Sequence, residues 1–213
     1  MSGARLVDVA PWCVGWVAPT PEYMHRTSHA VLAGGGVWYL DPVDDAAALE
    51  AAARLGPPAG VVQMLDRHGR DCAALAQRLG VPLHVLPSTA PAGAPFEVLP
   101  VVDAPRLRWR EVALWFPEHR ALAVAEAVGT APYFTAPGAT VGPHPVLRLV
   151  APPRVLLGRS AEHLLVGHGP GLHGPDTGRE MDAQISGARR AIPAWSVALS
   201  LMALGRLGGQ AAG

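Results

Sequence analysis

Residues 26–86 alternate strand-like and helix-like segments, and this order limits the possible folds more than any other feature of the chain. A β-hairpin is expected first, because two β-like segments flank the turn glycines 34–36. The elements expected over this region are a hairpin at 26–42, a helix at 44–55, a strand at 61–65, a helix at 71–79 and a strand at 81–86. Such alternation predicts an α/β fold in which helices cover a layered sheet.

The remainder of the chain returns to β structure and ends in helices. The expected elements are a hairpin at 111–128, a loop at 130–145, a strand at 163–166 and helical stretches at 176–190 and 193–207. Neither a repeat of short period nor a linker interrupts the chain. We therefore expect a single domain over 1–213, with the C-terminal helical segment 176–207 packed on it.

Composition excludes several classes of function. The formal net charge is zero and no long basic run occurs, so no nucleic-acid partner is expected. All 17 basic residues are Arg, which excludes a lysine Schiff base. The apolar run 197–204 is too short to span a bilayer, so no membrane partner is expected. The two cysteines, Cys13 and Cys72, form no disulfide framework, and a cytoplasmic location is expected.

Polar residues follow three of the strands directly. Asp41 ends the first hairpin, Asp66 and His68 follow the strand at 61–65, and His168 follows the strand at 163–166. In α/β folds ligands bind at the carboxyl ends of strands, because the loops there converge on one crevice. These residues therefore mark one end of the sheets as the candidate site.

The order of these elements resembles the metallo-β-lactamase superfamily. The sharpest matches are Leu40-Asp41-Pro42 at a strand end and Gly167-His168-Gly169 after a later strand. The resemblance covers roughly residues 23–175, and it implies a four-layer αββα sandwich. It also implies a zinc-dependent hydrolase, whose ligand motif in this family is H-x-H-x-D-H.

That motif is incomplete here. The corresponding stretch reads Asp66-Arg67-His68-Gly69-Arg70-Asp71-Cys72, and neither alignment register restores the family pattern. No histidine occurs over 98–110, and Gly129-Thr130 stands where the family has a Gly-Asp pair. The metal ligands that the resemblance leaves are His68 and His168 with Asp66 or Asp71, and Cys72 and His173 are further alternatives. Zinc is the metal implied, at one site rather than two.

The two arginines of this loop suggest a second kind of site. Arg67 and Arg70 precede a helix, whose N-terminal N–H groups favour an anion. Their guanidinium groups can hold that anion by bidentate contacts, and His173 is a further candidate for the same site. Alternatively, both pair with Asp66 and Asp71 in a self-satisfied cluster.

Several of these residues also have purely structural interpretations. Asp41 and Asp71 can cap the turns or helices that follow them. His68 can bond to nearby backbone, and Cys72 can pack as a small apolar side chain. Asp41 and Cys72 are therefore expected beside the site rather than as ligands.

Two functions remain open at this stage. The first is a hydrolase-like protein that cleaves a small ester or thioester through metal-bound water. The second is a non-catalytic member of the fold that binds a small molecule or another protein. The sequence leaves the oligomeric state undetermined.

Overall fold

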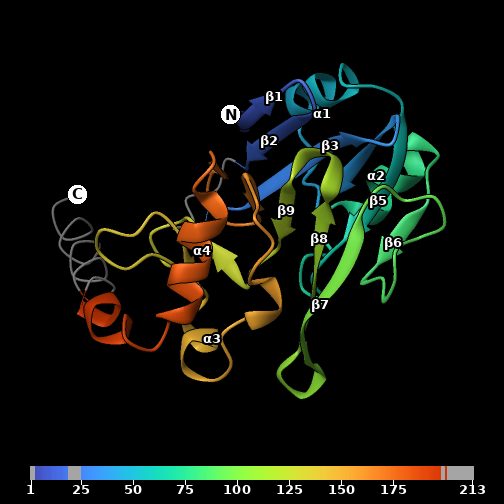
Figure 1. Cartoon of the computed structure of the whole chain (residues 1–213). Helices are drawn as coiled ribbons and strands as arrows, with labels where there is room; N and C mark the ends of the chain where they lie inside the picture. The colour runs from blue at the N-terminus through green and yellow to red at the C-terminus, as the bar shows by residue number, and fades with distance from the viewer. Residues whose placement is uncertain (1–2, 19–24, 198–199, 201–213) are drawn as a thin grey trace, which may run out of the picture.

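The computed structural model describes residues 3–18, 25–197 and 200, and it contains two large β-sheets. The first sheet has the strand order β1-β2-β3-β4-β5-β6 and the second has the order β13-β12-β9-β8-β7. A separate two-stranded sheet pairs β10 with β11. Helices cover the outer faces of the two large sheets, so the architecture is the expected αββα sandwich (Figure 1).

The first sheet is antiparallel over β1 to β4 and parallel over β4 to β6. Its strands are β1 (Arg5–Ala10), β2 (Cys13–Val17), β3 (Thr27–Ala33), β4 (Gly36–Leu40), β5 (Pro58–Gln63) and β6 (Leu83–Val85). The β3–β4 hairpin confirms the expected glycine turn, in which Gly34 and Gly35 adopt φ values of 58° and 80°.

Two helices cover the outer face of this sheet. They are α1 (Ala46–Ala53) and α2 (Cys72–Leu79), close to the expected bounds. Asp45 caps α1 by accepting from the Ala48 N–H at 3.0 Å, and Gly80 ends α2 in the left-handed conformation. Buried residues of both helices pack with Trp16, Tyr39 and Val61 in one apolar cluster.

The second sheet carries the later strands. They are β7 (Glu97–Ala104), β8 (Trp109–Phe116), β9 (Ala121–Val124), β12 (His163–Val166) and β13 (Leu172–His173), and the small sheet contains β10 (Val128–Gly129) and β11 (Gly142–Pro143). The short 3-10 helices are η1 (Pro105–Leu107), η2 (Pro117–His119) and η3 (Arg154–Leu156). Strands β9 and β12 are parallel, and the expected β8–β9 hairpin is confirmed.

Two further helices follow the strands. They are α3 (Pro145–Leu149), in the region that Pro152-Pro153 interrupts, and α4 (Thr177–Ser186). Met181 and Ile185 of α4 join the larger apolar cluster, to which β4, β8, β9 and β12 also contribute. Residues 192–197 are helical, and most of the expected helix at 193–207 lies outside the described residues. Within the described part of the chain, no helix has the length and apolar character needed to cross a bilayer.

Candidate metal centre

Four strand ends meet at one end of the two sheets. Asp41 follows β4, the loop 66–71 follows β5, Glu126 follows β9 and His168 follows β12. A backbone hydrogen bond from Thr27 N–H to Gly167 O, 2.9 Å long, joins the two sheets beside this point. The carboxyl ends of the parallel pairs β4–β5 and β9–β12 therefore face the same place, as the sequence predicted for Asp41, His68 and His168.

Three buried side chains converge there. His68, Glu126 and His168 each offer a ligand atom, and these atoms all lie within 4.8 Å of one another. The two imidazole rings are 5.4 Å apart between centroids. Among the residues that the structure describes, no other three His, Cys, Asp or Glu side chains bring their donor atoms together in this way.

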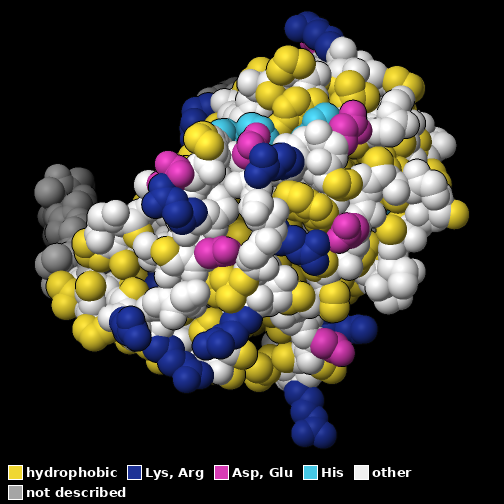
Figure 2. All heavy atoms as spheres, viewed as in Figure 1, with side chains coloured by type: hydrophobic (Ala, Val, Ile, Leu, Met, Phe, Trp, Pro, Cys, Tyr) yellow, Lys and Arg dark blue, Asp and Glu magenta, His cyan; other side chains and the backbone are white. Residues whose placement is uncertain are grey.

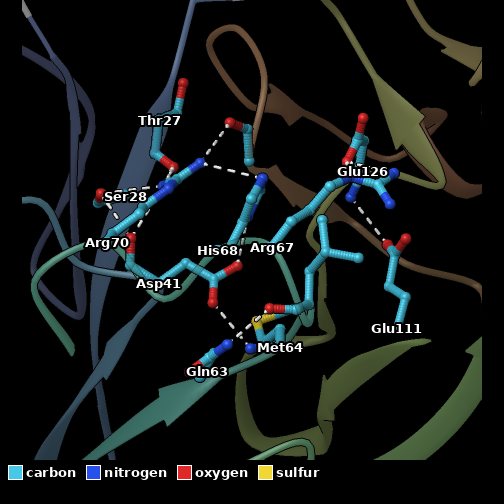
Figure 3. Close-up of polar contacts among 12 residues, drawn as sticks. Thr27, Ser28, Asp41, Gln63, Met64, Arg67, His68, Arg70, Glu111 and Glu126 are labelled. Atoms are coloured by element: carbon cyan, nitrogen blue, oxygen red, sulfur yellow. Dashed lines mark hydrogen bonds and ion pairs between the residues drawn. The ribbon is translucent and has the colours of Figure 1, made fainter. Parts of the chain in front are cut away.

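Asp41 orients His68. The Asp41 Oδ2 atom accepts from His68 Nδ1 at 2.8 Å, and its Oδ1 atom accepts from the Met64 N–H at 2.7 Å (Figure 3). Burial lowers the pKa of His68 well below its usual value, and the charges of Arg70 and Arg67 lower it further. The imidazole is therefore neutral, and with Nδ1 donating to Asp41 its Nε2 atom carries the lone pair, which lies 3.5 Å from Arg70 Nη2.

Glu126 is held by Arg67 through one oxygen only. Both Nε and Nη2 of Arg67 lie 2.8 Å from Glu126 Oε2. The other oxygen, Oε1, is 3.5 Å from His144 Nε2. Burial lowers the pKa of His144 to about 4, so this imidazole is neutral near pH 7 and leaves Oε1 without a cationic partner on that side.

A second buried carboxylate supports the turn that carries Glu126. Glu111 on β8 accepts from the N–H groups of Glu126 and Ala127, each at 2.8 Å, and from Trp109 Nε1 at 3.0 Å. Burial raises the pKa of Glu111 to about 7, although the hydrogen bonds from these three donors lower it. Arg67 lies over the Trp109 ring at 4.5 Å from its centroid, so the indole fixes both Glu111 and Arg67.

Glycines allow His168 to reach this position. A Cβ atom on Gly167 would collide with the carbonyl group of Ala125, and one on Gly169 would collide with Thr130 and Ala131. Gly169 also has a φ of 96°, which residues with a side chain rarely adopt. These two glycines therefore allow the backbone to approach the neighbouring loops closely. Phe134 stacks on the His168 ring with centroids 5.4 Å apart.

Arg70 has partners that the sequence did not suggest. Its Nη1 atom donates to the carbonyl oxygens of Thr27 at 2.6 Å and of Asp41 at 2.8 Å, and Nη2 donates to Gly167 O at 3.3 Å. Nη2 also lies 3.5 Å from His68 Nε2 (Figure 3). The alternative in which both arginines pair with Asp66 and Asp71 is wrong for Arg70, which bonds to backbone carbonyls. Arg67 lies 4.0 Å from Asp66, but its shorter contact is with Glu126 at 2.8 Å.

The two aspartates of the loop also have other partners. Asp66 accepts from the Arg110 N–H at 3.0 Å, and its Oδ1 atom lies 4.0 Å from Arg67 Nη1. Asp71 accepts from the Asp44 N–H at 2.8 Å and makes no side-chain cap to α2. The expected capping role of Asp71 is therefore wrong, and so is that of Asp41, which bonds to Met64 and His68.

Cys72 and His173 take no part in the three-residue group. Cys72 is buried in the first turn of α2, and burial raises its pKa to about 12, so its thiol stays protonated. The packing interpretation of Cys72 is confirmed. His173 is on β13, where it bonds to Asp8 at 3.0 Å and to His163 at 3.1 Å.

Glu126 was missed in the sequence. The signal was a charged residue inside the apolar run 121–128, since a carboxylate in a buried β segment needs a specific partner. The family pattern points instead to Gly129-Thr130, three residues later, where no carboxylate is present.

Two imidazoles and one carboxylate form a known ligand set for zinc, and Asp41 supplies the outer carboxylate that such histidines usually have. The set fits one ion. Among the described residues no second group of three such donors occurs, and the guanidinium groups of Arg67 and Arg70 flank this one.

The comparisons with known proteins bear on the fold. No protein-family model matches the chain, and no curated protein matches its sequence. Among solved structures, the metallo-β-lactamase FIM-1 from Pseudomonas aeruginosa gives a TM-score of 0.55 at 10% identity, covering 88% of this chain and 96% of that one. A metallo-β-lactamase from Pontibacter korlensis gives a TM-score of 0.54 at 13% identity, covering 86% of this chain and 99% of that one. DIM-1 metallo-β-lactamase gives 0.52 at 14% identity, covering 88% and 98%. The chain therefore has the metallo-β-lactamase fold.

Proposed function

We propose that this protein is a metal-dependent hydrolase with a single zinc ion held by His68, Glu126 and His168. The observation that carries the proposal is the convergence of their donor atoms within 4.8 Å in a buried site. One protein with this fold, the metallo-β-lactamase FIM-1, has a mono-zinc form.

A zinc ion with three protein ligands keeps one position for water and lowers the pKa of that water to near 7. Other side chains of the protein orient two of the proposed ligands. Asp41 fixes the ring of His68 with Nε2 facing the site, and Arg67 holds Glu126 through Oε2 while Oε1 stays available. The proposed substrate is a small ester or thioester, whose acyl–oxygen or acyl–sulfur bond is hydrolysed.

The positive charges around the triad favour a second candidate. Arg67 already neutralises Glu126, and Arg70 lies 3.5 Å from His68 Nε2, so both oppose a dication. In this alternative the protein is a non-catalytic module that binds a small molecule or another protein.

Metal analysis separates the two candidates. The protein is purified without a metal-binding tag, and its zinc content is measured before and after zinc is added. We expect about one equivalent of zinc, together with zinc-dependent hydrolysis of p-nitrophenyl acetate. Replacing His168 or Glu126 by Ala should abolish both, whereas the control His84→Ala, on β6, should keep both. Less than about a tenth of an equivalent of metal, unchanged by added zinc, contradicts the hydrolase and favours the binding module.

A further inference from the structure

A pocket of about 430 Å³ lies beside the candidate metal centre and on the other side of Arg67. Its lining residues are Asp66, Arg67, Pro105, Leu107, Arg108 and Arg110. The pocket is formed where the loop after β5 meets the turn between β7 and β8. This turn is the lower tip of the molecule in Figure 1, where arginine side chains project in Figure 2.

Hydrogen bonds fix the two walls of the pocket relative to each other. Arg67 Nη1 donates to the carbonyl oxygen of Arg108 at 3.0 Å, and Asp66 accepts from the Arg110 N–H at 3.0 Å. Trp109 between them is buried and lies against Arg67. The pocket is therefore preformed, which lowers the entropic cost of binding a ligand.

The pocket carries an excess of positive charge. Three arginines and one carboxylate residue, Asp66, line it, and one of the arginines, Arg67, is paired with Glu126 at 2.8 Å. Arg110 contacts Asp103 at 3.3 Å, but both side chains are more than half exposed, so this pair is weak. Within the described part of the chain, no carboxylate pairs with Arg108.

Apolar surface completes the pocket. Pro105 and Leu107 line it, and Leu107 is 67% exposed, so its apolar side chain is open to a ligand. A ligand that matches this surface has an anionic group for the arginines and a short apolar part for Leu107. Guanidinium groups hold carboxylate or phosphate oxygens in bidentate geometry.

We propose that this pocket binds an organic anion, with its carboxylate or phosphate group on Arg108 and Arg110 and its apolar part against Leu107. The same anion is the acidic end of the substrate, because Arg67 lines the pocket and holds Glu126 at 2.8 Å. This second step rests on the proposed hydrolase function. Anion binding itself does not require the metal.

Titration calorimetry on the full chain, treated with a chelator, tests anion binding with three probes: hexanoate, hexyl phosphate and 1-hexanol. We expect one or both anions to bind, with affinity falling as NaCl is raised, and the neutral alcohol to bind far more weakly. Binding of hexanoate alone identifies a carboxylate site, and binding of hexyl phosphate alone identifies a phosphate site.

Two variants on the same turn localise the binding. Arg108→Gln removes a charge from the pocket and should weaken anion binding about tenfold. Arg106→Gln removes the same charge from a residue that does not line the pocket, and it should leave the affinity unchanged. Equal binding of hexanoate and hexanol, or equal losses in the two variants, overturns the proposal.

Kinetics on the zinc-loaded protein separates this proposal from the proposed function. Arg108→Gln should raise KM for the anionic ester mono-p-nitrophenyl glutarate more than it raises KM for the neutral ester p-nitrophenyl acetate, whereas Arg106→Gln should leave the hydrolysis of both esters unchanged. Anion binding without zinc binding would overturn the hydrolase and retain the pocket. Zinc-dependent hydrolysis of the neutral ester without anion binding would do the reverse.

Discussion

Asp41 and His68, 27 residues apart in the sequence, form a 2.8 Å hydrogen bond that fixes one imidazole of the candidate metal centre. Asp41 also has a φ of 41°, a conformation that few side chains adopt, and its backbone carbonyl accepts from Arg70. The residue therefore joins the end of β4 to the loop after β5. Burial raises the pKa of Asp41 to about 7, although the charge of Arg70 and the hydrogen bond from the Met64 N–H both lower it.

Replacing Asp41 by Asn should weaken zinc binding by about 10- to 100-fold, because the outer carboxylate orients the ligating imidazole and makes it more basic. Competition with a chromogenic chelator measures the dissociation constant. The matched control is Asp44→Asn, since Asp44 is exposed and pairs with Arg78 at 2.6 Å. Equal zinc affinity in the Asp41 variant and the wild type contradicts a supporting role for Asp41.

Replacing Arg70 by Lys should lower the free energy of unfolding by about 1–3 kcal/mol. The guanidinium donates to carbonyl oxygens of Thr27, Asp41 and Gly167, which belong to three different segments, and a single ammonium group cannot reach all three. Urea denaturation measures the change. The control is Arg54→Lys, in an exposed pair with Glu50 on α1. If both variants lose the same small amount, Arg70 does not connect the sheets.

Replacing Gly167 by Ala should destabilise the protein by about 1–3 kcal/mol, because the added methyl group has no space beside the Ala125 carbonyl. The zinc site should weaken too, since this approach brings His168 beside Glu126. Gly69→Ala is the control, because a Cβ there meets nothing within 4 Å and Gly69 adjoins His68. Thermal melting and zinc content are measured on both variants, and a Gly167→Ala protein with normal values refutes the prediction.

Replacing Asp8 by Asn should destabilise the protein near neutral pH by about 1–3 kcal/mol. Burial alone would raise the pKa of Asp8, but hydrogen bonds from His173 and His29 outweigh it and hold the pKa well below 3.8. The folded state then binds fewer protons than the unfolded state below pH about 4, so the stabilisation exists above that pH and is lost as pH falls.

The measurement for Asp8 is the free energy of unfolding as a function of pH. The difference between wild type and Asp8→Asn should be present at pH 5 and should shrink below about pH 4. Asp103→Asn, at an exposed position on β7, should show no such dependence. A difference that stays constant down to the lowest accessible pH rules out an ionised Asp8 as its source.

Local pattern was sufficient to place much of the fold. The hairpin at 26–42, the helices that begin near 44 and 71 and the strand at 163–166 agree with β3–β4, α1, α2 and β12. Each depends on signals a few residues apart, such as turn glycines and helix ends. Asp41, His68 and His168 also follow from local pattern, because a polar residue directly after a buried strand emerges at the edge of the sheet.

The tertiary structure alone decided which side chains meet. Arg67 and Glu126 are 59 residues apart, and Arg70 and Gly167 are 97 apart, whereas the carboxylates nearest to both arginines in sequence bond elsewhere. A long guanidinium side chain reaches several ångströms from its backbone, so its partner depends on which element packs opposite. The sequence by itself determined where the strands end and which of them carry polar residues. The packing of one sheet on the other determined that Glu126 joins His68 and His168, because their donor atoms come within 4.8 Å of one another only once both sheets are in place.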